Sequence, residues 1–342
     1  MSQFILGPGG LRFILSALVV IEHISHYKVG VVAVMTFFVL SGYWVTLVYE
    51  RSHAHAIRGV PTFYLSRAMR VFPLYLVIFL VVAALASLIA MPLQPDVWMA
   101  LPILGVASHG TDIIGVTWSL DIELQFYLLL PLLIMLLRWP GRRQGQGWRI
   151  LAGALLLSWF LGLVLASRYG MLTVLLCLPI FLFGVATHLF DFKIRRTQAR
   201  MSLLLFFLMG LVIISLPGTR DLLLHGRGSR LSDALFAMYW CIPLLPFIAY
   251  NVRQPSDARD RFLGDLFYPI YLVHFPLATL AAFLLGRDMA NWEKLVYLGA
   301  VLLISVGIYH LVDRWSEAFR HRFIRQLLGR QGHARRSPSV GE

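Results

Sequence analysis

The stretch that decides the fold is Leu11 to Tyr27, which reads LRFILSALVVIEHISHY. It is apolar enough to enter a bilayer, yet it carries Arg12 near its start and Glu22, His23 and His26 near its end. Ionisable side chains at membrane depth are costly and are usually functional. His23 follows Arg12 by eleven positions, so at 3.6 residues per turn both lie on one helical face, about 16 Å apart along the axis. We expect the function of the protein to lie along this face.

The composition indicates an integral membrane protein. Of 342 residues, 58% are hydrophobic and 14% are charged, against about 25% charged in an ordinary soluble domain. Most of the 30 Lys and Arg residues fall into clusters at 51–70, 138–149, 193–200, 253–261 and from 314 onward. These clusters alternate with nearly uncharged connections, as the positive-inside rule requires. The net charge of +13 therefore reflects membrane topology and does not indicate a nucleic-acid partner.

Placing every basic cluster in the cytoplasm predicts an all-α, multi-pass protein with about ten transmembrane helices and both termini cytoplasmic. The predicted spans are 11–27, 29–49, 71–91, 119–138, 150–167, 171–190, 201–217, 232–250, 263–286 and 294–313. Residues 1–320 form one predicted transmembrane domain, and residues 321–342 a basic, disordered cytoplasmic tail. The connection 92–118 is broken by Pro and Gly and is expected to be interfacial or re-entrant. Cys177 and Cys241 lie in apolar runs and predict no disulfide framework.

Several polar residues in or beside the predicted spans are candidates for function. Ser41 lies in FFVLSGY, where small residues usually serve helix packing. Arg67 and Arg70 are three positions apart at the start of a span, a spacing that suits a phosphate group. The arginines at 220, 227 and 230 fall in a connection expected outside, where they face either lipid or an anionic ligand.

Two later spans carry further candidates. In WSLDIELQFY, from Trp118 to Tyr127, Glu123 lies deeper than Asp121 and shares a face with Ser119 and Tyr127. A carboxylate there is costly against lipid, so Glu123 is predicted to face the protein interior. Tyr271 and His274 lie on one side of a later span, and His310, Asp313, Arg314 and Glu317 are interpreted as an interfacial charge network.

Together these segments resemble the acyltransferase family 3 membrane proteins, which O-acylate sugars and other hydroxyl acceptors at the bacterial envelope. The matching motifs occur in the family's order: Arg12 with ten residues before His23, FFVLSGY at 37–43, RAMR at 67–70 before Phe72-Pro73, WSLDIELQFY at 118–127 and YPIYLVH at 268–274. Gly-Pro-Gly-Gly precedes Arg12 where the family more often has Asp-Gly, and Tyr43 stands where it often has Phe. The resemblance implies that His23 is catalytic, Arg12 its partner and Glu123 a functional carboxylate. It also implies a cytosolic acetyl-CoA donor and an acceptor across the membrane.

On this basis the protein is expected to be an O-acetyltransferase of the bacterial inner membrane. His23 takes the proton of an acceptor hydroxyl as general base. Arg12, Arg67 and Arg70 bind the acyl-CoA donor, while Ser41, Tyr127, Tyr271 and His274 line the substrate path. No cofactor is expected to stay bound, because acetyl-CoA acts as a co-substrate. The acceptor is expected to be a carbohydrate or a lipid-linked sugar. A neighbouring carboxylate, Glu22 or Glu123, would raise the basicity of His23, and desolvation would lower it.

Other interpretations remain open. Within the same class, the acyl group could pass through a covalent intermediate on Ser41 or Ser119, or the acceptor could be a lipid or a secondary metabolite such as a macrolide. A polytopic transporter would also carry buried Arg, Glu and His. A metal site is disfavoured, because His23 with His26, and His53 with His55, lack a third ligand at suitable spacing.

Overall fold

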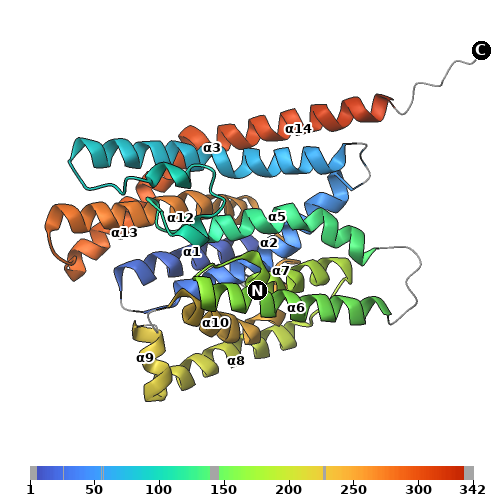
Figure 1. Ribbon diagram of the computed structural model, residues 1–342, viewed down its shortest axis with the longest axis horizontal. Helices are drawn as coiled ribbons and strands as arrows, with labels where there is room; N and C mark the ends of the chain where they lie inside the picture. The colour runs from blue at the N-terminus through green and yellow to red at the C-terminus, as the bar shows by residue number, and fades with distance from the viewer. Residues whose placement is uncertain are drawn as a thin grey trace, which may run out of the picture.

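The protein is a bundle of helices, with no strand in the part of the chain that the structure describes. The computed structural model describes residues 6–25, 27–54, 56, 58–138, 146–225 and 229–334. Most helices in Figure 1 run roughly parallel or antiparallel to one another, with α3 and α14 on one side, α8 and α9 on the other, and α1, α2 and α12 between them. The all-α prediction is therefore confirmed.

The helices follow the chain in this order: α1 Pro8–Ile24, α2 Gly30–Ser52, α3 Gly59–Leu88, α4 Val106–His109, α5 Thr117–Leu137, α6 Gln146–Tyr169, α7 Val174–Leu189, α8 Arg196–Ser215, α9 Pro217–His225, α10 Arg230–Cys241, α11 Leu245–Asn251, α12 Ala258–Leu285, α13 Asn291–Ile308 and α14 Arg314–Ala334. Short 3-10 turns lie at Val97–Ala100 and Ile242–Leu244, and a π turn at Tyr309–Asp313 joins α13 to α14.

Among the described residues, seven helical segments are long and apolar enough to cross a membrane. They are Gly30–Ser52, Gly59–Leu88, Thr117–Leu137, Arg196–Ser215, Arg230–Asn251, Ala258–Leu285 and Asn291–Leu328. Two shorter apolar helical stretches, Leu155–Tyr169 and Val174–Leu189, and the 17-residue α1 coincide with the other predicted spans. The protein is thus a multi-pass membrane protein, while the count of ten and the cytoplasmic placement of both termini stay predictions.

Two boundaries differ from those expected. α3 begins at Gly59, well before the predicted start at residue 71, so Arg67 and Arg70 lie inside a membrane-spanning helix. α14 is helical as far as Ala334, so the predicted boundary at residue 320 falls within a helix, and residues 335–342 lie outside the described chain. Both differences arise because a hydropathy window marks only the apolar part of a helix, whereas tertiary packing can stabilise the helix beyond that part.

The connection before α5 is tied to the start of α5 by Asp112, a half-buried carboxylate. Asp112 accepts hydrogen bonds from the backbone N–H groups of Ile114, Gly115 and Thr117 at 3.0, 2.8 and 2.7 Å and from the Thr117 hydroxyl at 2.6 Å. Burial raises the pKa of Asp112, and these donors oppose the shift. Gly115 has φ +77°, and a Cβ there would lie 2.0 Å from the Phe275 ring. The connection therefore packs against α12 where α12 meets the end of α1.

α2 and α7 cross at two glycines. A Cβ at Gly42 would lie 2.1 Å from the Phe181 carbonyl oxygen, and one at Gly184 would lie 2.1 Å from that of Val39. Backbone cannot give way to this extent, so the crossing requires glycine on both helices, as is common between membrane helices.

We expect Gly184→Val to lower the free energy of unfolding by about 1–3 kcal/mol, because it overpacks this crossing. Gly299→Val on α13 is the matched control, since a Cβ there meets nothing within 4 Å. Thermal unfolding in detergent measures both variants. Equal stability of the two would contradict the close crossing.

Candidate active site

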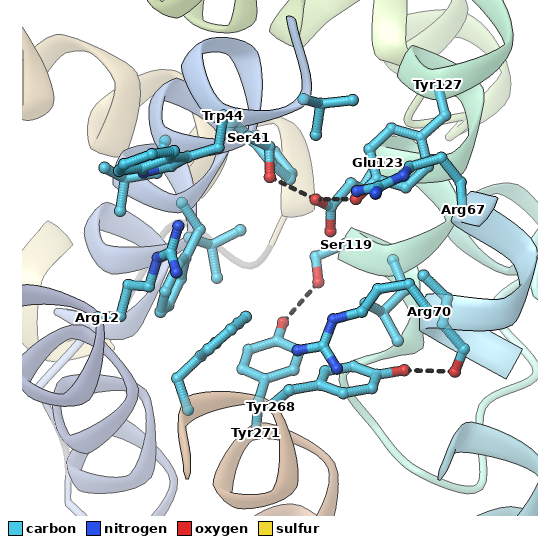
Figure 2. A pocket seen from close by; sticks show the side chains of 18 residues that line it. Arg12, Ser41, Trp44, Arg67, Arg70, Ser119, Glu123, Tyr127, Tyr268 and Tyr271 are labelled. Atoms are coloured by element: carbon cyan, nitrogen blue, oxygen red, sulfur yellow. Dashed lines mark hydrogen bonds between the residues drawn. The ribbon is translucent and has the colours of Figure 1, made fainter. Parts of the chain in front are cut away.

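A pocket inside the bundle collects most of the predicted site residues. α1, α2, α3, α5 and α12 all contribute side chains to it (Figure 2). Its polar lining consists of Arg12, Ser41, Trp44, Arg67, Arg70, Ser119, Glu123, Tyr127, Tyr268 and Tyr271. Seven predicted residues thus meet in one place, while the predicted His23 and His274 are not among the lining residues.

Arg12 is held at the pocket by the way α1 begins. Asp260 at the start of α12 accepts hydrogen bonds from the N–H groups of Gly9 and Gly10, at 3.0 and 2.7 Å. A carboxylate at a helix N-terminus stabilises its unpaired N–H groups. The Arg12 guanidinium then lies over the rings of Trp44 and Phe267, at 5.4 and 5.8 Å from their centroids. Asp260 and Asp265 lie close enough to act on its charge, but the guanidinium forms no ion pair with a carboxylate among the described residues.

The two arginines of α3 differ in their partners. Arg67 lies over the rings of Phe63 and Tyr127 at 5.9 and 5.8 Å, and its Nε is buried without a hydrogen-bond partner. Arg70 forms ion pairs with Asp313 at 3.0 Å and Glu317 at 2.9 Å. Arg67 is therefore the α3 cation that remains available to a ligand.

Asp313 and Glu317 reach Arg70 through the π turn. An extra residue per turn rotates the side chains that follow it, and such turns often occur at functional sites. Glu317 also pairs with Arg320, which donates to the Ser66 hydroxyl at 3.1 Å. Part of the interfacial network predicted for this segment therefore holds Arg70 in place at the pocket. The spacing of the residues alone did not predict this role.

Glu123 is the only carboxylate among the residues lining the pocket. Its Oε1 accepts hydrogen bonds from the Ser41 hydroxyl and from the Tyr127 hydroxyl, the latter at 2.5 Å. Asp313 and Glu317 compensate Arg70, so among the lining residues Arg12 and Arg67 share the single carboxylate of Glu123, while Asp260 and Asp265 act on Arg12 from outside the lining. The pocket therefore carries an excess of positive charge and suits an anionic ligand.

Asp121 has a structural role. It is fully buried, accepts from the Ala107 N–H at 2.9 Å, and accepts from the Gln125 side chain at 2.9 Å. It joins α5 to α4.

His23 lies beyond the pocket, in the last turn of α1, and pairs with His274. The two ring centroids are 5.1 Å apart, and the Phe275 ring meets His23 edge-on at 4.8 Å. Neither carboxylate considered from the sequence is its partner. Glu22 accepts from the N–H groups of Gly30 and Val31 at 2.5 and 3.1 Å and so caps α2, whereas Glu123 is held inside the pocket.

Tyr271 and Ser119 stand between the pocket and the two histidines. Their hydroxyls are 2.5 Å apart, and the Tyr271 ring lies 5.9 Å from the His274 ring. The continuous passage expected from Arg12 to His23 is therefore not open in this structure. Contact runs from the pocket through Tyr271 to His274 and then to His23.

Sequence reasoning missed Trp44, Phe267 and Tyr268 as lining residues. They lie within or beside the motifs already singled out, but aromatic residues are too common in membrane helices to be noticed there. No group of three or more His, Cys, Asp or Glu suited to a metal ion occurs among the described residues. His26 and His55, named in that context, lie outside them, as does Arg227.

The fold and the pocket define a multi-pass membrane protein with a buried, positively charged ligand site. The chain belongs to the acyltransferase 3 family, because the family model described as an acyltransferase domain matches residues 5–310. This match confirms the resemblance and the assignment to membrane acyltransferases. Comparisons with curated proteins and with solved structures gave no match.

Proposed function

We propose that the protein is an O-acyltransferase of the bacterial inner membrane. It transfers an acetyl or other acyl group from cytosolic acyl-CoA to a hydroxyl of an envelope or exported carbohydrate, free or lipid-linked. The observation that carries this proposal is the placement of Arg12 and Arg67 in a pocket that leads through Tyr271 to a pair of histidines. Neither arginine is ion-paired to a carboxylate among the described residues.

The donor fits the pocket by charge and shape. A coenzyme A thioester is long, thin and anionic at one end. Unpaired guanidinium groups bind phosphate oxygens well because their donors form a planar fork. We assign Arg12 and Arg67 to the donor's anionic or polar part, with Arg70 held in place by Asp313 and Glu317. The Oε2 of Glu123, which has no hydrogen-bond partner among the described residues, accepts from a donor amide.

The transfer itself takes place at His23. The unprotonated imidazole accepts the proton of the acceptor hydroxyl as the oxygen attacks the thioester carbonyl, forming the ester C–O bond. The C–S bond breaks, and the proton held by His23 passes to the departing thiolate. To bring the thioester there, the acyl end must pass the Ser119–Tyr271 contact, so these side chains rotate aside when the donor binds.

A covalent route through Ser41 is the second candidate, because the Ser41 hydroxyl donates a hydrogen bond to the Glu123 carboxylate. In that route Glu123 takes the Ser41 proton, an acyl-serine forms and free thiol leaves before the acceptor binds.

Ser41→Ala separates the two routes. Direct transfer predicts that the variant keeps at least one tenth of the wild-type kcat, since only a hydrogen bond to Glu123 is lost. Rapid-quench measurement with acetyl-CoA alone is expected to show no burst of free thiol. A burst in the wild-type protein that is absent from Ser41→Ala would establish the covalent route instead.

The proposed function is tested by following the acyl group. Cells with the intact gene and cells with a deletion are given isotope-labelled acetate, and envelope glycans are analysed by mass spectrometry. We expect a labelled acyl increment that disappears in the deletion strain. An unchanged glycan profile, together with substrate counterflow by the purified protein in vesicles, would show a transporter instead.

A further inference from the structure

His274 is a fully buried histidine with one nitrogen left unpaired. Its Nδ1 lies 3.1 Å from the Ile270 carbonyl oxygen. A carbonyl only accepts, so Nδ1 carries the hydrogen and donates it. In a neutral imidazole the other nitrogen, Nε2, is then a lone-pair acceptor. Nε2 has no hydrogen-bond partner among the described residues, which is rare for a buried polar atom.

The surroundings hold the His274 ring next to His23. The Tyr297 hydroxyl of α13 donates to the His274 carbonyl oxygen at 2.7 Å and fixes the backbone of this turn. The Phe275 ring, which lies close to the backbone of Gly115, packs edge-on against His23. The rings are tilted by 38° at 5.1 Å, close enough for a nitrogen of one to meet a nitrogen of the other after a rotation of the half-buried His23 side chain.

The other titratable groups around this pair have partners of their own. They are Glu22 in the last turn of α1, Lys28 between α1 and α2, Tyr271 on α12, Tyr297 on α13 and Asp112 in the connection before α5. Glu22 caps α2 and lies 3.9 Å from Lys28, and Tyr271 is bonded to Ser119. Tyr297 and Asp112 are engaged as described above. His274 Nε2 is thus the acceptor left for an N–H of His23.

We infer that His274 is a positioning residue for His23, an inference that rests on the proposed function and deepens it. Nε2 of His274 accepts a hydrogen bond from one ring N–H of His23, which leaves the other His23 nitrogen unprotonated and directed at the acceptor hydroxyl. The hydrogen bond at one nitrogen sets which tautomer a histidine adopts. When His23 takes the hydroxyl proton, the same lone pair stabilises the imidazolium until the proton passes to the thiolate. The histidine pair thus takes the role of a histidine–carboxylate pair, because the neighbouring carboxylate, Glu22, is turned to the start of α2.

His274→Phe tests this inference, because it keeps a flat ring in the buried site and removes the lone pair. We expect kcat to fall about 10- to 100-fold, the effect of losing one hydrogen bond to a charged group, with the KM for acyl-CoA unchanged. The acid limb of the kcat/KM profile moves to lower pH, because protonated His23 has lost a stabilising partner. His274→Gln restores an acceptor and is expected to recover part of the rate.

His53→Phe is the matched control. His53 is 2% exposed, its Nε2 also lacks a partner among the described residues, and it packs on Phe63, but it lies at the other end of α2 from His23. Its variant should keep the wild-type acid limb. Folding of each variant is checked by gel filtration in detergent. If His274→Phe does not fold, His274→Leu takes its place, and the same changes in kcat and in the acid limb are expected of it.

The inference would be overturned if the wild-type protein is active and depends on His23, and the folded His274 variant has the same kcat and the same acid limb of the kcat/KM profile as the wild type. That outcome differs from failure of the proposed function, in which the wild-type protein itself transfers no acyl group.

Discussion

His23→Ala is expected to lower kcat for acyl transfer by about 10²- to 10⁴-fold, the usual contribution of a general base. The KM for acyl-CoA should stay within about threefold, because the cations assigned to the donor line a pocket that His23 does not touch. Steady-state assays with labelled acetyl-CoA and a soluble acceptor in detergent measure both constants.

The control for this change is His109→Ala, which removes an exposed histidine of α4. It should leave both constants unchanged. Added imidazole is expected to restore part of the rate of His23→Ala and none of the rate of a variant damaged elsewhere. A His23→Ala protein with wild-type kcat would refute the assignment of the base, although the family membership would stand.

Arg67→Ala is expected to raise the KM for acyl-CoA about 30- to 150-fold, which corresponds to a lost charged contact of about 2–3 kcal/mol. The variant should fold, because no carboxylate in the described part of the chain is ion-paired to Arg67. Arg70→Ala differs, since it would leave the buried Asp313 without its ion-pair partner and Glu317 with Arg320 only. Arg51→Ala, an exposed arginine at the end of α2, is the control.

The Arg67 effect should also depend on the donor. Thioesters of dephospho-CoA and of pantetheine carry less charge than acetyl-CoA. The ratio of the variant's KM to the wild-type KM should therefore be smaller for these donors than for acetyl-CoA. An equal ratio for acetyl-CoA and acetyl-pantetheine would mean that Arg67 does not bind the donor's anionic groups.

The sequence was sufficient to predict those parts of the site that depend on helical spacing. Arg12 and His23 were placed on one face of α1, and Arg67 with Arg70 on one face of α3, because 3.6 residues per turn fixes such relations. Glu123 was predicted to face the interior because a carboxylate is costly against lipid, and it does line the pocket. The order of the motifs then identified the family correctly.

The direction in which a polar side chain points was not predictable in the same way. Glu22 is next to His23 in sequence, yet it turns to the start of α2, because unpaired N–H groups at a helix N-terminus attract a carboxylate. The contact of Asp313 with Arg70 depends on a π turn, which leaves no signal in hydropathy. The Ser119–Tyr271 contact joins helices far apart in sequence and blocks a passage that spacing alone had left open.

The central claim is that an acyl group moves from a donor on the basic side of the membrane to a hydroxyl on the other side. The direct test uses sealed vesicles in which the purified protein has a known orientation, with labelled acetyl-CoA supplied only at the side of Arg51 and a soluble carbohydrate acceptor only at the side of His109. We expect labelled ester on the acceptor with the wild-type protein and none with His23→Ala. Product that forms only when donor and acceptor share one compartment would contradict the account.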